Sequence, residues 1–462
     1  MMFSSNWRPF VLTAGETCLL VGAVAAGSYV RLGSDAWWLL HNDNGLWKAL
    51  LIVGVCQLSL YYADLYDLRG VGDVRDLTAR LIQALGVTSL ILAGIYFLAP
   101  DWIVGRGVFL ISVVFMVTLL VAWRVTFAWL TQRVAPRERL LLVGTSIAAV
   151  ELAKELFERR QELGVEIVGF VDPDPARVGA PVLNPGVVGT IDDIPLLVSN
   201  LNVDRVVVSL ADARGKLPMD RLLDIRLDIG VTFDHLATVY EEYTGKIAVE
   251  NLRPSWLIFS EGFRKTRLLA TAKRVLDIAC SAAGLLIGAP IMLLVAIAVR
   301  CTSSGPILYH QRRVGLHGRE FTAHKFRTMR EDAESATGPV WSTSNDTRIT
   351  PIGGFLRRTR LDEMPQLWNV LVGEMSFVGP RPERPEFVRQ LTEKIPFYGQ
   401  RHVLKPGLTG WAQVRYTYGA SVEDAIEKLQ YDLYYIKNLS IALDVVIVLE
   451  TIKTVITRKG AR

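Results

Sequence analysis

Two adjacent acidic residues, Asp362 and Glu363, lie within a region of the sequence that is dense in arginine and lysine. Basic motifs occur before and after the pair, at residues 325–329 (KFRTM), 357–360 (RRTR) and 378–382 (VGPRP). Carboxylates bind divalent metal ions or act as nucleophiles, and guanidinium groups bind phosphate oxygens in a bidentate manner. This combination predicts a site for a metal-bound phosphorylated substrate, and phosphoryl transfer is the first hypothesis.

Other residues that could do chemistry give weaker signals. An acidic pair on a helix more often lies on a solvated face than forms a catalytic dyad. The catalytic interpretation of Asp362 and Glu363 therefore depends on the surrounding motifs. The histidines have no spacing typical of a metal site. The four cysteines lie in or beside apolar segments without a CxxC motif, which favours buried free thiols. Some nearby arginines could equally bind anionic lipid head groups: Arg312, Arg313, Arg358 and Arg360.

The composition indicates a membrane protein. The chain has 462 residues, of which 50% are hydrophobic, and its mean hydropathy is +0.28. This hydrophobic fraction and mean hydropathy are too high for an ordinary soluble protein of this length. The length suggests about three domains. The net charge of +5 is modest and gives no reason to expect a nucleic-acid partner.

Apolar runs predict a four-helix transmembrane bundle over residues 1–135. The runs cover residues 10–30, 46–62, 81–99 and 108–130. Each is close to the roughly 20 residues that cross a bilayer. The loops after the second and fourth runs are rich in arginine, so the positive-inside rule puts both ends of the bundle in the cytoplasm. Glu16 and Arg124 lie inside the runs, where we expect structural anchoring or snorkelling rather than a functional pair.

Residues 138–255 alternate short β-like runs with helical patterns, which predicts a parallel α/β sheet. The β-like runs are residues 139–143, 166–171, 203–210 and 230–234. The domain resembles a Rossmann-like fold, but Ser146 and Ala149 stand where the dinucleotide fingerprint needs glycine. Without the glycine at the first of these positions, the backbone is hindered from approaching a pyrophosphate closely. We therefore expect a structural, oligomerising or regulatory domain, with nucleotide binding as the minor alternative. Residues 256–270 are predicted to be a linker.

A fifth apolar run, residues 278–299, is long enough to cross a membrane but carries Pro290 near its midpoint. Proline inside a helix removes a backbone hydrogen bond and kinks the helix. Both flanks are basic, and residues 300–330 contain seven lysines and arginines against one acid, Glu320. A crossing helix would leave one basic flank outside, against the positive-inside rule. We predict a re-entrant helix over residues 276–300 that breaks at Pro290, with an ordinary transmembrane span as the alternative.

A series of motifs follows in order along residues 271–462. They are 273–277 (KRVLD), 311–315 (QRRVG), 325–329 (KFRTM), 361–366 (LDEMPQ), 369–371 (NVL), 373–376 (GEMS), 379–382 (GPRP) and 405–410 (KPGLTG). With these motifs the chain resembles the bacterial sugar transferases, the monotopic-type polyprenyl-phosphate phosphoglycosyl transferases. The upstream bundle and Rossmann-like domain are similar to those of the larger family members. The predicted fold is therefore a helical membrane bundle, an α/β Rossmann-like domain, and a mainly α (α+β) catalytic domain with a re-entrant membrane helix.

The resemblance implies an enzyme of the bacterial inner membrane, with its catalytic domain facing the cytoplasm. It would transfer a sugar-1-phosphate from a UDP-sugar to undecaprenyl phosphate and release UMP. The product would initiate synthesis of an exopolysaccharide, a capsule or an O-antigen. A homodimer is a further expectation, with the bundle and the middle domain as the candidate surfaces. The sequence does not identify the sugar.

The resemblance also implies roles for individual residues. Asp362 would be the nucleophile that forms a covalent phosphosugar–aspartyl intermediate, and Glu363 would hold Mg²⁺ together with Asp362. Phosphate-binding positions would be Lys325, Arg327, Arg357 and Arg381, with Arg381 at the nucleotide end of the donor. Asp277 is expected to form a salt bridge within its helix, to Lys273 or Arg274. Residues 440–457 are expected to form an amphipathic helix.

Two other functions remain as alternatives. The first is a membrane scaffold or regulator that keeps the transferase fold without activity, which the intact acidic pair and Arg357 argue against. The second is an oxidoreductase that modifies nucleotide sugars in the middle domain. The missing glycines and the lack of a Tyr-x-x-x-Lys motif in residues 138–255 argue against this second function.

Overall fold

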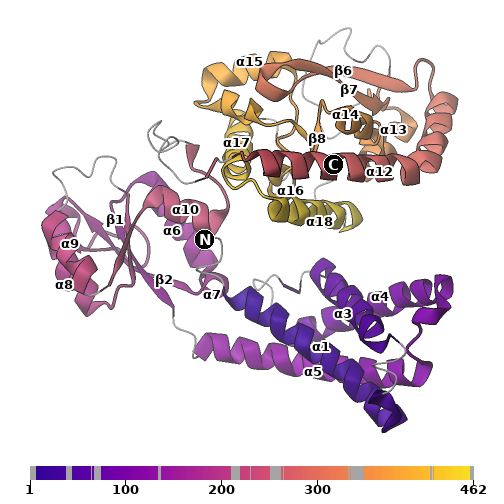
Figure 1. The fold of residues 1–462 in the computed structure, drawn as a ribbon. Helices are drawn as coiled ribbons and strands as arrows, with labels where there is room; N and C mark the ends of the chain where they lie inside the picture. Colours follow the sequence, from indigo (N-terminus) through magenta and orange to yellow (C-terminus); the bar gives the residue numbers. More distant parts are fainter. Residues whose placement is uncertain are drawn as a thin grey trace. The chain divides into compact units, whose positions relative to one another are not determined.

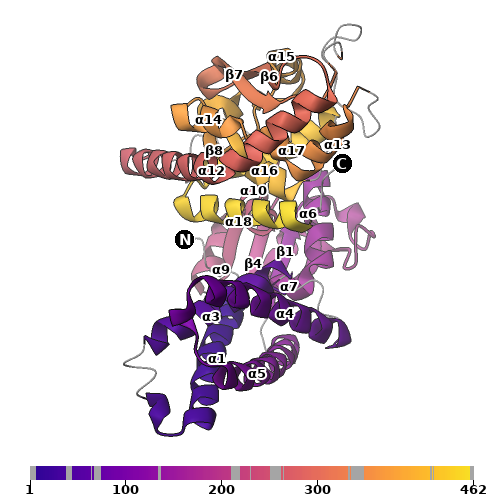
Figure 2. The ribbon, with the colours of Figure 1, turned by 90° about the vertical axis from the view of Figure 1, so that its right-hand side faces the viewer.

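The computed structural model describes residues 7–37, 44–63, 65–66, 74–133, 137–209, 219–228, 230–249, 262–263, 265–330, 333, 348–416, 419 and 421–457. The chain divides into two compact units, Met1–Asp234 and His235–Arg462, and each is considered by itself. Of the predicted linker, residues 256–261 and 264 lie outside the described residues. Figures 1 and 2 show the elements of both units from two sides.

The first unit begins with long apolar helices that match the four predicted runs. They are α1 (Trp7–Leu32), α3 (Gly45–Tyr62), α4 (Val74–Leu98) and α5 (Arg106–Arg133). All four contribute to one hydrophobic core. Helices α1 and α5 pack closely (Figure 1), because a Cβ atom at Gly15 would lie 2.4 Å from Trp123 Cζ2. Small residues at such crossings are typical of membrane helices.

Five helices of the described chain are long and apolar enough to cross a membrane: Phe10–Leu32, Gly45–Tyr62, Thr78–Leu98, Gly107–Phe127 and Arg267–Thr302. Together with the composition, they identify a membrane protein. The orientation of these helices in a bilayer stays a prediction.

Glu16 and Arg124 form a buried ion pair between α1 and α5. Glu16 Oε1 lies 2.7 Å from Arg124 Nε, and the two side chains are 0% and 3% exposed. Arg124 also donates a hydrogen bond to the main-chain oxygen of Leu65, just beyond α3. The pair therefore anchors three segments to one another, as predicted, and neither side chain snorkels to a surface.

A five-stranded sheet in the order β3-β2-β1-β4-β5 forms the rest of the first unit. Its strands are β1 (Glu138–Val143), β2 (Val165–Asp172), β3 (Val187–Thr190), β4 (Arg205–Val208) and β5 (Thr232–His235). Strand β1 pairs in parallel with β2 and β4, and β2 pairs in parallel with β3. The helices of this domain are α6 (Ile147–Glu158), α7 (Arg160–Leu163), α8 (Ile194–Asn200) and α9 (Met219–Asp228). The predicted parallel α/β domain is thus confirmed.

The second unit is mainly helical with two small sheets. Strands β6 (Leu308–Val314) and β7 (Glu320–Phe326) form an antiparallel hairpin, and β8 (Ser376–Val378) pairs in parallel with β9 (Gly407–Thr409). Its helices are α10 (Leu236–Thr244), α12 (Arg267–Thr302), α13 (Pro351–Thr359), α14 (Gln366–Val372), α15 (Pro385–Lys394), α16 (Trp411–Arg415), α17 (Val422–Lys437) and α18 (Ile441–Thr457). The last of these matches the predicted amphipathic helix, and it contributes Leu443 and Ile447 to the main core of the unit.

Helix α10 belongs to the second unit by its contacts, although it lies within residues 138–255, the range predicted for the middle domain. Glu241 of α10 accepts hydrogen bonds from Lys437 at 2.5 Å and from Asn438 at 2.9 Å. Trp411 of α16 donates to the main-chain oxygen of Gly245 at 2.8 Å. The boundary between the two compact units falls after Asp234 in the sequence, within the range predicted for the middle domain.

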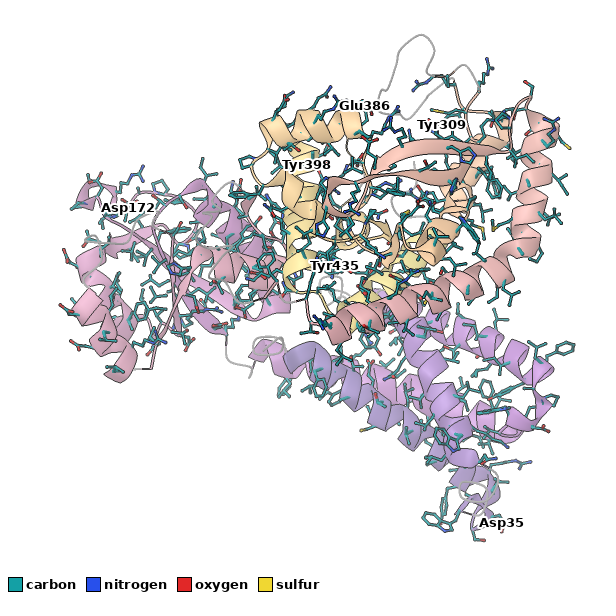
Figure 3. All side chains as sticks on the ribbon, turned by 45° about the horizontal axis from the view of Figure 1, so that its top comes forward. Asp35, Asp172, Tyr309, Glu386, Tyr398 and Tyr435 are labelled. Atoms are coloured by element: carbon teal, nitrogen blue, oxygen red, sulfur yellow. The ribbon has the colours of Figure 1, made fainter. Side chains whose placement is uncertain are left out.

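Helix α12 contains the fifth apolar run and bends along its length (Figures 1 and 3). It begins at Arg267, inside the predicted linker, because the Thr266 side chain caps it by accepting from Leu269 N. Pro290 lies in its interior, as the predicted break requires. Its first half packs on α14, and its second half packs on β7 and α13 through Val295 and Val299.

The predicted salt bridge of Asp277 within α12 is wrong. Asp277 Oδ1 instead accepts hydrogen bonds from Ser376 Oγ at 2.9 Å and Phe377 N at 2.8 Å. The two basic neighbours bond elsewhere: Lys273 pairs with Asp444 at 2.6 Å, and Arg274 donates to main-chain oxygens of α14. The reason is burial, because Asp277 is only 5% exposed and a buried carboxylate needs fixed donors. Asp277 therefore fixes α12 to strand β8.

Candidate active site

A tight turn presents the acidic pair. The Thr350 side chain caps the start of helix α13 by accepting from Gly353 N, and Arg360, in the left-handed conformation with φ of 58°, caps its end. The chain then turns directly into the short 3₁₀ segment Leu361–Glu363. A positive φ at a non-glycine residue is uncommon and occurs often at functional sites. Asp362 and Glu363 follow this turn and are both 8% exposed.

Glu363 is surrounded by cations. Its Oε1 accepts hydrogen bonds from Lys325 Nζ at 2.8 Å and from Arg381 Nη2 at 2.7 Å, and Arg360 Nη1 lies 3.9 Å away. Burial alone would raise the pKa of Glu363, but the charges of Arg381, Lys325 and Arg360 hold this pKa well below its usual range. The Glu363 carboxylate is therefore ionised at neutral pH.

Asp362 has a different environment from its neighbour. Its Oδ1 is buried and has no hydrogen-bond partner within the described part of the chain. Burial and the Glu363 carboxylate together raise the pKa of Asp362 to about 6. At neutral pH the carboxylate is still mostly ionised, and its buried oxygen is available to a phosphorus atom or a cation. The two acids are thus adjacent but unequal.

Arg381 connects the acidic pair to helix α16. One of its terminal nitrogens donates to Glu363, and the other, Nη1, donates to Gln413 Oε1 at 2.8 Å. Its main-chain oxygen accepts from Arg401 Nη2 at 3.0 Å, and Pro380 and Pro382 restrict the backbone on either side. Gln413 could not be predicted as a site residue, because a single glutamine after a glycine-containing motif carries no chemical signal of its own.

The other two predicted phosphate ligands, Arg357 and Arg327, also bond to residues outside the acidic pair. Arg357 Nε donates to Thr328 Oγ1 at 2.9 Å, and its charge lowers the pKa of Asp362. Arg327 is 4% exposed, and its Nη2 donates to the main-chain oxygen and the hydroxyl of Ser303, where α12 ends. Its Nε and Nη1 are buried without a hydrogen-bond partner among the described residues. Arg327 therefore fixes the end of α12 and keeps two unused donors.

The acidic pair fits Mg²⁺ better than it fits a metal held by protein ligands alone. No group of three or more His, Cys, Asp or Glu side chains that could hold a metal ion is found in the described residues. Magnesium usually takes one or two carboxylates and completes its coordination with phosphate oxygens and water. The unpartnered Oδ1 of Asp362 is a suitable oxygen donor, with Glu363 beside it. Among the described histidines, His310 and His324 face each other across the β6–β7 hairpin, with their Nδ1 atoms 2.8 Å apart.

Comparison with known proteins identifies two families along the chain. The family described as bacterial sugar transferase matches residues 268–458, and the family described as CoA-binding domain matches residues 62–224. The first match covers all the residues of the candidate site.

Three curated relatives extend the comparison. The UDP-N-acetylgalactosamine-undecaprenyl-phosphate N-acetylgalactosaminephosphotransferase of Aeromonas hydrophila is 40% identical over 228 residues, which are 49% of this chain and 53% of that protein, so the chain spans about half of its length. The UDP-glucose:undecaprenyl-phosphate glucose-1-phosphate transferase of Xanthomonas campestris pv. campestris is 35% identical, over 70% of this chain and 68% of that protein. A protein of the same name from Escherichia coli (strain K12) is 30% identical over 96% of this chain and 97% of its own length.

Proposed function

Because the chain belongs to the bacterial sugar transferase family, we propose that it is an enzyme that transfers a sugar-1-phosphate from a UDP-sugar to undecaprenyl phosphate. We propose only the class of donor, a UDP-sugar, because the names of two relatives specify different donors, UDP-N-acetylgalactosamine and UDP-glucose. The product, undecaprenyl diphosphate sugar, would serve as the first lipid-linked unit of an exopolysaccharide, a capsule or an O-antigen.

In the first step, a carboxylate oxygen of Asp362 attacks the phosphorus that bears the sugar. An acyl phosphate bond forms, the bond from this phosphorus to the bridging oxygen breaks, and UMP leaves with the electron pair. A carboxylate is ionised at neutral pH, so it acts as a nucleophile without a general base. The buried, unpartnered Oδ1 of Asp362 and its raised pKa support this assignment, since a more basic carboxylate is a better nucleophile.

In the second step, a phosphate oxygen of undecaprenyl phosphate attacks the same phosphorus. The bond to Asp362 breaks, and the free carboxylate returns. The bond between the sugar and its phosphate oxygen is never broken, so the anomeric configuration is retained. Two displacements at one phosphorus also allow the soluble donor and the lipid acceptor to use one site in turn.

Charge compensation is the main task of the basic residues. Attack by a carboxylate on a diphosphate brings negative charges together, and cations must offset this repulsion and stabilise the leaving phosphate. Lys325 and Arg381, which lie 2.8 Å and 2.7 Å from Glu363 Oε1, are suited to the nucleotide phosphate. Arg357 and Arg327 are proposed as further phosphate ligands, and the two unused nitrogens of Arg327 support that role.

Asp362 and Glu363 would hold Mg²⁺, for which their donor set fits. When bound, Mg²⁺ would offset negative charge on the diphosphate and on the departing UMP. Glu363 itself contributes in a second way, because its carboxylate orients Lys325 and Arg381 through hydrogen bonds.

We also propose that α12 is re-entrant and that the catalytic unit lies at the cytoplasmic face of the inner membrane. Both halves of α12 pack on the same unit: Asp277 bonds to β8, and Val299 packs with Phe326 and Leu356. Helix α12 bends along its length (Figures 1 and 3), so its two halves do not form one straight span. Leu286 and Ile287, near Pro290, are 79% and 75% exposed, which suits contact with lipid.

The observation that carries the proposal is the unequal pair, with Glu363 bound by two cations and Asp362 buried with a free oxygen. The test incubates membranes containing the protein with radiolabelled UDP-sugars, Mg²⁺ and undecaprenyl phosphate. We expect a lipid-linked product with at least one sugar and none from Asp362→Asn. Full turnover by that variant would refute the assignment of Asp362 as the nucleophile. If none of the sugars gave a product, a membrane scaffold without activity would be favoured instead.

A further inference from the structure

Gln413 lies next to Arg381 because three glycines bring α16 close to the segment that contains Gly379 and Arg381. A Cβ atom at Gly410, directly before α16, would lie 2.1 Å from the main-chain oxygen of Gly379, and one at Gly407 would lie equally close to Gly379 N. Only glycine permits this approach of two backbones. Gln413 N then donates to the main-chain oxygen of Gly410 at 2.9 Å, so the first turn of α16 holds the glutamine next to Arg381.

The hydrogen bond with Arg381 fixes which way the Gln413 amide points. A guanidinium group has only donors, so the amide must present its oxygen to Arg381 Nη1, at 2.8 Å. The amide nitrogen is therefore directed away from Arg381. Nε2 is buried and has no hydrogen-bond partner within the described part of the chain. A buried donor without a partner is costly, and one that lies in a binding site is commonly satisfied by the ligand.

We propose that Gln413 is a substrate-binding residue whose Nε2 donates a hydrogen bond to an uncharged oxygen of the nucleoside, either a base carbonyl or a ribose hydroxyl. This inference rests on the proposed function, in which the donor is a nucleoside diphosphate sugar. Gln413 would then recognise the nucleoside through this hydrogen bond, while Arg381 binds the adjoining phosphate.

The position of Gln413 relative to the nucleophile supports the nucleoside end of the donor. In an in-line displacement the leaving group lies opposite the attacking atom, so the nucleotide extends away from Asp362. Arg381 lies next to Glu363, and Gln413 lies on the other side of Arg381. The phosphate charges already have cationic partners in Lys325 and Arg381. An amide is the kind of neutral group that orients carbonyl and hydroxyl oxygens in ligand sites.

The test measures binding of UMP to the full-length protein in detergent by calorimetry, for the wild type and for Gln413→Met. This variant keeps the volume of the side chain but removes the amide. We expect the Kd for UMP to rise about tenfold to a hundredfold, the loss of one buried hydrogen bond, with the Kd for inorganic pyrophosphate unchanged. Gln400→Met, at an exposed position, is the matched control and should change neither value.

A second variant separates substrate binding from a merely supporting role. Gln413→Glu can still accept from Arg381 but has no donor, so it should also bind UMP weakly. Wild-type UMP affinity in this variant, or equal weakening of UMP and pyrophosphate by Gln413→Met, would overturn the nucleoside contact. A wild-type protein that binds UMP but makes no lipid-linked product would contradict the proposed function and leave this inference intact. A wild type that does not bind UMP would overturn the inference.

Discussion

Replacing each acid of the pair by its amide should change stability in opposite directions. The unfolded chain ionises Asp362 near its ordinary pKa of 3.8, whereas the folded protein keeps the proton up to a pKa of about 6. Ionised Asp362 therefore destabilises the fold: the effect is absent below pH 3.8, grows between pH 3.8 and 6, and is complete above pH 6. Asp362→Asn mimics the protonated form, so at pH 8 it should be more stable than the wild type.

The size of this effect follows from the raised pKa of Asp362. A rise from 3.8 to about 6, at about 1.4 kcal/mol per pH unit, corresponds to roughly 3 kcal/mol. For a unit of the size of His235–Arg462, each kcal/mol of unfolding free energy moves the thermal midpoint by about 2–4 °C. Asp362→Asn should therefore melt about 6–12 °C above the wild type at pH 8, and the gain should fade as the pH approaches 4.

Glu363→Gln is the matched comparison. The pKa of Glu363 is held well below its usual range by Arg381, Lys325 and Arg360 against the opposing effect of burial. Its ionised form stabilises the fold above the unfolded pKa, and that stability is lost as the pH falls. Glu363→Gln should therefore melt below the wild type at pH 8. The assay is a thermal melt of the detergent-solubilised protein, followed by tryptophan fluorescence at several pH values. A midpoint for Asp362→Asn at or below the wild-type value at pH 8 would refute the reasoning.

Three further predictions follow from the site and from α12. The rate of UMP release in the first step should fall as the pH drops through about 6, because protonation of Asp362 removes the nucleophile; a rate that is flat from pH 7.5 to 5 would contradict this. EDTA should abolish transfer and added Mg²⁺ should restore it, whereas full activity in EDTA would exclude the proposed ion. In a variant without Cys280 and Cys301, cysteines introduced at Leu268 and Leu308 should both react with an impermeant thiol reagent from the cytoplasmic side only, and labelling from opposite sides would show that α12 spans the membrane.

Much of the fold could be predicted because long-range burial leaves a periodic or apolar signal. The apolar runs at 10–30 and 46–62 correspond to α1 (Trp7–Leu32) and α3 (Gly45–Tyr62) within a few residues. Strand β3 (Val187–Thr190) could not be predicted because four residues that include a glycine are too few to show a pattern. The start of α12 at Arg267 was missed because a single capping threonine is a weak local signal.

The candidate site was predicted in part. The dense motifs were sufficient to indicate that Lys325 and Arg381 would gather around the acidic pair, and both contact Glu363. Individual partners depend on the tertiary fold and could not be derived from spacing. Asp277 illustrates this, because its basic neighbours in sequence suggested a helical ion pair, whereas burial against β8 provided better donors. Gln413 illustrates the converse, since its importance depends on a contact between segments 32 residues apart.

The central claim is that Asp362 becomes covalently phosphorylated by the donor. The most direct measurement incubates the full-length protein with a UDP-sugar and Mg²⁺ in the absence of undecaprenyl phosphate, followed by rapid quenching, proteolysis and mass spectrometry. A phosphosugar adduct on the peptide that contains Asp362, formed together with an equal amount of UMP and lost on addition of undecaprenyl phosphate, is the predicted result. Release of UMP only when undecaprenyl phosphate is present, with no adduct on that peptide, would contradict the account.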